Sequence, residues 1–148
     1  MDRVEGTVLG FFEAHRNHDV EAMASCCADG ADFSYVPVEW WGRQRVVRGQ
    51  GTVGTVGKAV WTGLFEAFAD LTNDVTSLVS DGNGNVAAEV VVSGTQSGTW
   101  GTIGNRRRRF SVPHLFVFRV GDSGLIERVA AYWDDAELRE QLGAVEVD

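Results

Sequence analysis

Two spacings of apolar residues divide this chain and limit the folds open to it. Over about residues 2–30 and 58–69 the apolar positions recur every three or four residues, which predicts amphipathic helices. From residue 71 onward apolar and polar residues alternate between glycine-rich turns, which predicts antiparallel hairpins. Helices segregated from hairpins along the sequence are typical of the α+β class. With 148 residues and no linker or internal repeat, we expect one α+β domain over residues 1–148.

The same patterns give the boundaries of the expected elements. The predicted helices cover about residues 2–16, 19–30 and 58–69, and a closing helix begins at Asp134 or Asp135. The predicted strands cover about residues 33–37, 71–80, 86–94, 106–120 and 125–133. The stretch 39–57 has five glycines and no clear period, so we predict a loop there. A curved antiparallel sheet wrapped around such helices would leave a pocket at its open end.

The charge of the chain argues against two classes of partner. It has 13 Lys and Arg against 21 Asp and Glu, a net charge of −8. Because nucleic-acid binding needs a basic face, we expect no nucleic acid as partner, and no anionic membrane surface. No apolar run approaches the ~20 residues of a membrane span, and no secretory leader is predicted.

Cysteine usage and motifs bear on location and cofactors. Cys26 and Cys27 are adjacent, which suits neither a disulfide framework nor a metal site. Neither the stretch 49–57 nor the stretch 94–104 has the context of a phosphate-binding loop. We therefore predict a cytoplasmic protein without a metal or a cofactor.

Several stretches, in this order, resemble a known family. They are Leu64–Leu71, Gly94–Gly98, His114–Phe116, and Tyr132–Asp134 followed by Gln141–Gly143. Together they resemble the SnoaL-like polyketide cyclases of the nuclear-transport-factor-2-like superfamily, which includes ketosteroid isomerase. The resemblance runs over nearly the whole chain. It implies a cone-shaped α+β barrel, in which a strongly curved, mostly antiparallel sheet wraps around three helices and encloses one apolar pocket.

The resemblance also implies site residues. In these cyclases an aspartate on the last strand is the general acid/base of an intramolecular aldol closure, and Asp134 matches it by its spacing to Gln141. A pocket histidine commonly supports that aspartate, and His114 matches it. Gln96 stands where the family often has histidine, so it can hydrogen-bond a carbonyl but cannot shuttle a proton near neutral pH.

Strand alternation gives a second argument for the same pair. His114 shares a strand face with Phe116, although its ring could instead be tied to a buried carbonyl. If His114 lies opposite Tyr132, then Asp134 is one step away on the same face. A shift of one residue moves Asp134 to the other face, where it would serve as the N-cap of the closing helix. The sequence leaves this register open.

Aromatic side chains supply the candidates for substrate binding. Tyr132 and Tyr35 are predicted to donate to a carbonyl or enolate oxygen, although each could be a half-buried core residue. The predicted substrate-binding residues are Tyr35, Trp40, Trp41, Trp61, Gln96 and Phe116. Aromatic residues around a pocket suit a flat or polycyclic ligand.

Three functions follow from these features. The first is a cofactor-independent cyclase or isomerase that uses acid/base catalysis on a small hydrophobic carbonyl compound, polyketide-like or steroid-like. The second is a non-catalytic protein that binds such a compound. The third is a hydrolase like limonene epoxide hydrolase, whose Asp-Arg-Asp set we cannot assemble from this sequence. An enzyme needs at least two ionisable groups converging on the pocket, whereas a binder does not.

The last expectation concerns the oligomer. Both faces of the strand predicted over 86–94 look apolar at Val90, Val91 and Val92. A strand that is apolar on both faces needs cover on both faces. Together with the family resemblance, this predicts a homodimer through the outer face of the sheet.

Overall fold

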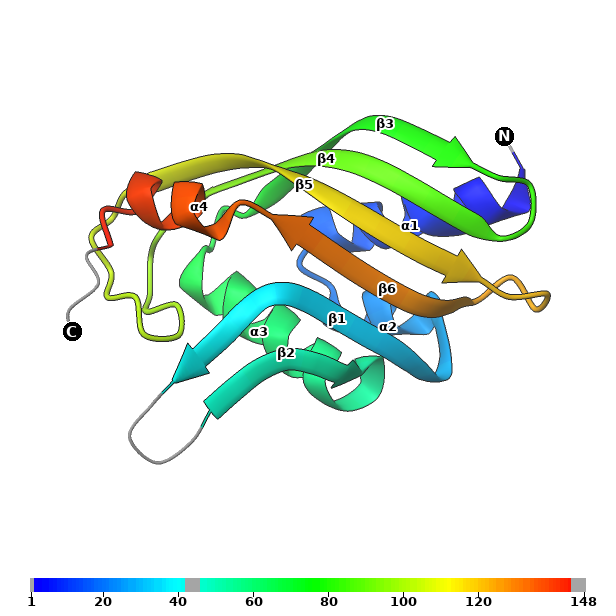
Figure 1. Ribbon diagram of the computed structural model, residues 1–148, viewed down its shortest axis with the longest axis horizontal. Helices are drawn as coiled ribbons and strands as arrows, with labels where there is room; N and C mark the ends of the chain where they lie inside the picture. The colour runs from blue at the N-terminus through cyan, green and yellow to red at the C-terminus, as the bar shows by residue number, and fades with distance from the viewer. Residues whose placement is uncertain (1, 42–45, 145–148) are drawn as a thin grey trace.

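The fold is built on one curved, unclosed sheet of six strands (Figure 1). The computed structural model describes residues 2–41 and 46–144. The strands are β1 (Cys27–Trp41), β2 (Val46–Thr52), β3 (Thr72–Ser80), β4 (Asn85–Thr95), β5 (Arg109–Val120) and β6 (Ile126–Trp133). Their order is β2-β1-β6-β5-β4-β3, and only β1 and β6 pair in parallel. The predicted class, α+β with a mostly antiparallel sheet, is confirmed.

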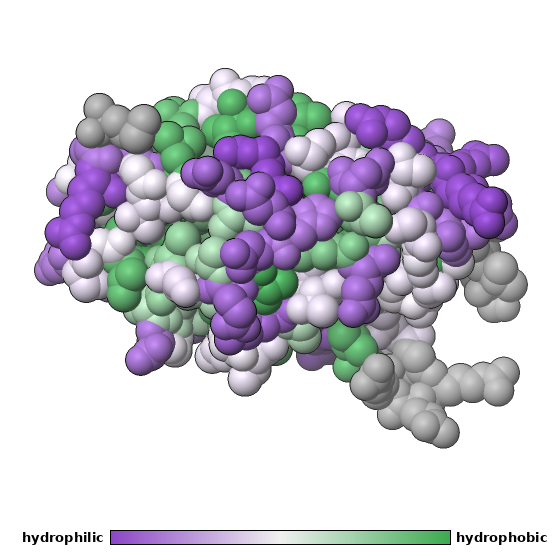
Figure 2. Space-filling view, turned by 180° about the vertical axis from the view of Figure 1, so that it is seen from behind, coloured by the Kyte–Doolittle hydropathy of each residue, from purple (hydrophilic) through white to green (hydrophobic). Residues whose placement is uncertain are grey.

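Four helices accompany the sheet. They are α1 (Arg3–Arg16), α2 (Val20–Ser25), α3 (Lys58–Ala67) and α4 (Asp135–Gln141), with a π-helical turn η1 (Val53–Gly57) leading into α3. The sheet curves around α1, α2 and α3, while α4 lies at one end beside β5 (Figure 1). Seen from the opposite side, the surface mixes hydrophilic and apolar residues (Figure 2). Among the described residues, none of the helices is both long and apolar enough to span a membrane.

The core lies between α1 and the centre of the sheet. Asp2 caps α1 by accepting the N–H of Glu5 at 2.8 Å. The buried face of α1 is Val8, Phe11, Phe12, Ala14 and His15, and Phe11 and Phe12 are fully buried. Their rings meet the face of β5 edge-on, with ring centroids 5.4 Å apart for Phe11 and Phe118. The spacing of apolar residues in α1 therefore determines how this helix lies on the sheet.

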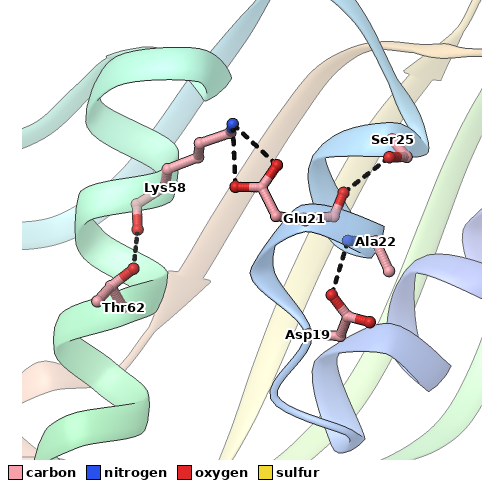
Figure 3. Close-up of polar contacts among 6 residues, drawn as sticks. All are labelled: Asp19, Glu21, Ala22, Ser25, Lys58 and Thr62. Atoms are coloured by element: carbon pink, nitrogen blue, oxygen red, sulfur yellow. Dashed lines mark hydrogen bonds and ion pairs between the residues drawn. The ribbon is translucent and has the colours of Figure 1, made fainter.

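Polar contacts tie α2 to α3 (Figure 3). Asp19, at the predicted start of the second helix, caps α2 by accepting the N–H of Ala22 at 2.9 Å. Lys58, the first residue of α3, donates to the carboxylate of Glu21 at 3.2 Å. These contacts fix where each helix begins and how the two lie side by side.

The second helix is shorter than predicted. It ends at Ser25 rather than near Gly30, and β1 begins at Cys27. The cause is long-range, because Cys27 pairs with Ile126 of β6 and draws the chain into the sheet. Gly30, with a φ of +72°, lies within β1 and not at a helix end.

The predicted loop over 39–57 is mostly strand. β1 continues past Pro37 to Trp41, because its pairing with β2 shifts between Ser34 and Glu39 and such a bulge tolerates proline. β2 is an edge strand with mostly exposed side chains, so it lacks the alternation that reveals a strand. Residues 42–45 of the predicted loop lie outside the described residues.

Candidate active site

A small cavity lies between the helices and the concave face of the sheet. Its free volume is about 20 Å³, which is room for one water molecule. Its lining residues are His15, Tyr35, Leu64, Phe68, Leu71, Val92, Trp100, Phe110, His114, Phe116, Trp133 and Leu138. Three of them are ionisable, and the others are apolar or aromatic. An apolar pocket with a few convergent polar groups is the usual form of a binding or catalytic site.

His114 supplies a hydrogen-bond acceptor to this cavity. Its Nδ1–H donates to the carbonyl of Val112 at 2.9 Å, which assigns the lone pair to Nε2. Burial lowers the pKa of His114 to about 4, although its hydrogen bonds to the backbone raise it. The ring is therefore neutral near pH 7. It stacks on Trp133, with ring centroids 4.7 Å apart.

His15 supplies a hydrogen-bond donor from α1. Asn73 Oδ1 accepts from the guanidinium of Arg16 at 2.8 Å, which orients the amide so that Nδ2 donates to His15 Nδ1 at 2.8 Å. The proton of the neutral ring is therefore on Nε2. Burial, and after it the neighbouring His18, His114 and Arg16, together lower the pKa of His15 to about 3.

Tyr35 supplies a second donor from β1. Its hydroxyl oxygen accepts the indole N–H of Trp61 at 2.9 Å. The hydroxyl proton is thus left for a partner in the cavity. Burial raises the pKa of Tyr35, so the hydroxyl stays protonated at neutral pH.

The three groups form a neutral acid/base set. His114 Nε2 can accept a proton, while His15 Nε2–H and the Tyr35 hydroxyl can donate to a developing negative oxygen. The apolar surround strengthens each of these interactions, because little water is present to screen them. Among the described residues, no group of three or more His, Cys, Asp or Glu side chains is arranged to hold a metal ion.

The sequence of residues 8–129 matches a family described as the SnoaL-like domain. The chain belongs to the SnoaL-like family. The match covers most of the sequence, including five of the six strands in full and the first half of β6, so the resemblance to this family is confirmed. Curated proteins give no significant match to this SnoaL-like domain.

Solved structures share the fold of this SnoaL-like domain. IdmH from Streptomyces antibioticus, a proposed polyketide cyclase, is 23% identical, with a TM-score of 0.78 over 97% of this chain and 100% of its own. TsrD from Streptomyces laurentii is 23% identical, with a TM-score of 0.77 over 98% and 99%. An LEH-like epoxide hydrolase of M. tuberculosis is 17% identical, with a TM-score of 0.67 over 95% of this chain and 89% of its own. At these identities the likeness shows the fold alone.

The predicted pairing of His114 with Asp134 is wrong in this SnoaL-like domain. His114 lies opposite Trp133, and Tyr132 lies opposite Leu115 on the outer face, where it is 39% exposed. Asp134 is exposed, and its Oδ1 caps α4 by accepting the N–H of Glu137 at 3.1 Å. The register differs by one residue from the one that would bring Asp134 and Tyr132 into the pocket.

The predicted substrate-binding residues divide into two groups. Tyr35 and Phe116 line the cavity. Trp61 is fully buried behind Tyr35, and Trp40 lines a neighbouring groove. Trp41 is 67% exposed and lies under the guanidinium of Arg48, so it is not a pocket residue.

Gln96 is buried but does not line the cavity. Its side-chain Nε2 donates to the carbonyl of Ile103 at 3.0 Å, which anchors the turn that carries Trp100. The expectation that Gln96 contacts a substrate carbonyl stays a prediction, which this position outside the cavity lining does not favour. It helps to shape a wall of the cavity instead.

Nine of the twelve lining residues were not among the sequence candidates, and His15, Trp133 and Trp100 are the polar or largest of these. The sequence could have indicated His15, because it is the ionisable member of the otherwise apolar buried face of α1. Ionisable side chains are seldom buried without a partner, so a histidine there is a candidate functional residue. Nothing in the sequence except their aromatic side chains indicated that Trp133 and Trp100 line the cavity. Their places depend on the register of β6 and on the turn between β4 and β5.

Proposed function

We propose that this SnoaL-like protein is a cofactor-independent enzyme that moves a proton next to the carbonyl of a small hydrophobic compound, polyketide-like or steroid-like. The observation that carries the proposal is the convergence of His15, Tyr35 and His114 on one apolar cavity. Two or more ionisable groups on a pocket distinguish an enzyme from a simple binder.

The proposed reaction uses these three groups in turn. His114 Nε2 removes a proton from the carbon beside the carbonyl, and the electron pair of the C–H bond moves to form an enolate. The Tyr35 hydroxyl and His15 Nε2–H stabilise its negative oxygen. In an isomerisation His114 returns the proton to another carbon. In a cyclisation the enolate carbon attacks a second carbonyl, and the resulting alkoxide takes the proton from His114.

The alternatives have weaker support. A non-catalytic binder would not need three polar groups so oriented by Val112, Asn73 and Trp61. An epoxide hydrolase would need an Asp-Arg-Asp set, and the cavity lining described above contains neither Asp nor Arg. The proposed cyclase IdmH and the hydrolase share only the fold with this chain, so neither decides the reaction.

The test is hydrogen exchange on ketones in heavy water. Wild-type protein is incubated with acetophenone, 2-acetylnaphthalene and 2-acetylphenanthrene, and deuterium entry into the methyl group is followed by NMR. We expect protein-dependent exchange that falls at least a hundredfold in His114→Gln. Asp134→Asn is the matched control and should exchange like wild type. Exchange that is equal in wild type and His114→Gln would refute the proposal.

We also propose a homodimer through the outer face of the sheet. Val36, Val79, Leu115 and Tyr132 are each 39–62% exposed on strands of this sheet. A hollow of about 650 Å³ lies there, and its lining includes Val91, Pro113, Leu115 and Tyr132 together with the polar Thr76 and Glu89. Exposed apolar side chains gathered in this way are typical of an interface. A cytoplasmic location stays a prediction.

A further inference from the structure

A second hollow lies next to the cavity and shares one wall with it. This groove has a volume of about 390 Å³ and is open to solvent. It runs along α3, η1 and β2, and its lining includes Trp40, Val56 and Ala59, with Arg48 and Glu66 as charged members. Of the lining residues described for the two hollows, Trp100 alone belongs to both. Its indole therefore separates the groove from the cavity.

The indole of Trp100 is held by ring contacts. It meets Trp40 edge-on with ring centroids 4.6 Å apart, and Phe68 at 6.4 Å. No hydrogen bond to its Nε1 is found among the described residues. Trp100 is only 6% exposed, so its side chain is buried where the two hollows adjoin. Moving this wall requires the separation of aromatic rings and no loss of a side-chain hydrogen bond.

The turn that carries Trp100 is anchored at its base. Trp100 and Ile103 exchange two backbone hydrogen bonds of 3.0 and 2.8 Å, which make the turn a compact unit. Gln96 holds that unit through its backbone N–H to Arg108 and its side chain to Ile103. Gly101 has a φ of +59°, and a Cβ there would overlap the Trp40 ring. The backbone of the turn can therefore stay in place while the Trp100 side chain rotates.

The two hollows differ greatly in volume. Ligand pockets usually measure roughly 300–1,000 Å³. The cavity that holds the acid/base groups has about 20 Å³, whereas the groove has about 390 Å³. Neither hollow suffices alone. The cavity holds the proposed acid/base groups but is too small for a ligand, whereas the groove is large enough for a ligand but lacks those groups.

We propose that the groove and the cavity are two halves of one substrate site, with Trp100 as the movable wall between them. The substrate is then a ketone of several fused apolar rings, whose carbonyl end enters the cavity while the distal rings lie along α3. This inference rests on the proposed function, which supplies the reacting carbonyl. The apolar lining with aromatic Trp40 at its edge suits flat fused rings.

The test compares ketones that share one reacting group and differ in length. Dissociation constants of acetophenone, 2-acetylnaphthalene and 2-acetylphenanthrene are measured by ligand-observed NMR. Ala59→Phe fills the groove from an exposed position on α3, and Thr62→Phe adds the same ring to α3 away from the groove. We expect Ala59→Phe to weaken binding of the three-ring ketone at least tenfold and of acetophenone less than twofold. Thr62→Phe should change neither.

The role of Trp100 as a movable wall is tested by the association rates of the ketones. Trp100→Phe, with a smaller ring, should speed binding of the three-ring ketone at least threefold, and its melting temperature verifies that it folds. An unchanged affinity in Ala59→Phe, an unchanged rate in Trp100→Phe, or no binding of any of the three ketones overturns the inference. Length-dependent binding without deuterium exchange would support the two-part site and refute only the proposed reaction.

Discussion

The indole of Trp133 lies nearly parallel to the imidazole of His114, at an interplanar angle of 18° and a centroid distance of 4.7 Å. Trp133 is in turn fixed by its Nε1–H, which donates to Asp135 Oδ1 at 3.1 Å. The other oxygen of Asp135 accepts from Arg139 at 2.7 Å. The carboxylate of Asp135, outside the cavity, thereby orients the indole of Trp133, which in turn orients the proposed base His114.

Asp135 is accordingly expected to be a positioning residue. Asp135→Ala removes both acceptors, so Trp133 can turn and His114 loses its stacking partner. We expect ketone exchange to fall about tenfold, with an altered pH profile, because a misplaced base is slower. Arg139→Met is the control that keeps the Trp133 bond, and it should lose less than threefold. Equal losses in the two variants would mean that the ion pair acts only through stability.

Tyr35→Phe should separate catalysis from folding. The change removes the donor to the enolate oxygen, a loss of about 10²–10³ in rate at comparable sites. It also leaves the buried N–H of Trp61 without its acceptor, which costs about 1–3 kcal/mol. Rate and free energy of unfolding are measured in the same samples. A variant that is destabilised but fully active would remove Tyr35 from the reaction.

Stability is expected to fall in mild acid. The pKa values of His15 and His114 are lowered to about 3 and about 4 in the folded protein, against 6.5 for an unperturbed histidine. Between these values the unfolded chain binds protons that the native state does not, so the free energy of unfolding decreases as pH falls below about 6.5. The slope is at most roughly 1.4 kcal/mol per pH unit for each histidine.

Denaturant unfolding at about pH 7 and about pH 5 measures this effect. His114→Phe keeps a flat apolar ring and removes one titrating group, so its stability should change less between the two pH values. The carboxylate of Asp70, whose pKa is lowered by a hydrogen bond from the Thr95 backbone, contributes only at lower pH. A pH dependence identical in wild type and His114→Phe would show that His114 is not buried in its neutral form.

Asp134 is expected to matter for the helix and not for the reaction. Asp134→Asn should retain stability and activity, since asparagine caps a helix about as well as aspartate. Asp134→Ala removes the acceptor of the Glu137 N–H and should cost about 0.5–2 kcal/mol. Thermal melts and exchange assays on both variants test this. Loss of exchange in a stable Asp134→Asn protein would return Asp134 to the catalytic residues.

The proposed dimer depends on the apolar outer face. Leu115→Arg places a charge at its centre, next to Tyr132 across the β5–β6 pair, and should yield monomers. Thr62→Arg on α3 is the control and should stay dimeric. Sedimentation equilibrium at micromolar concentration distinguishes the two states. A wild-type mass near the monomer value of 16.1 kDa would contradict the prediction.

The elements that the sequence determined are those whose signals are local. The helical period of α1, the start of α2 at Asp19, and the glycine-rich turn between β5 and β6 each depend on residues a few positions apart. Helical period, capping and turn chemistry act at that range, so they can be read without partners. The edge strand β2 was missed because its exposed residues carry no alternation.

The composition of the site was decided by tertiary structure. Whether Trp133 or Tyr132 lies opposite His114 depends on one residue of register between β5 and β6. Both registers keep the strands antiparallel, so the turn and the alternation do not choose between them. The choice is made by burial of Val129 and Ala131 inside and by the cap that Asp134 gives α4. His15 and Tyr35 likewise meet His114 only once α1 and β1 have packed on the same face of the sheet.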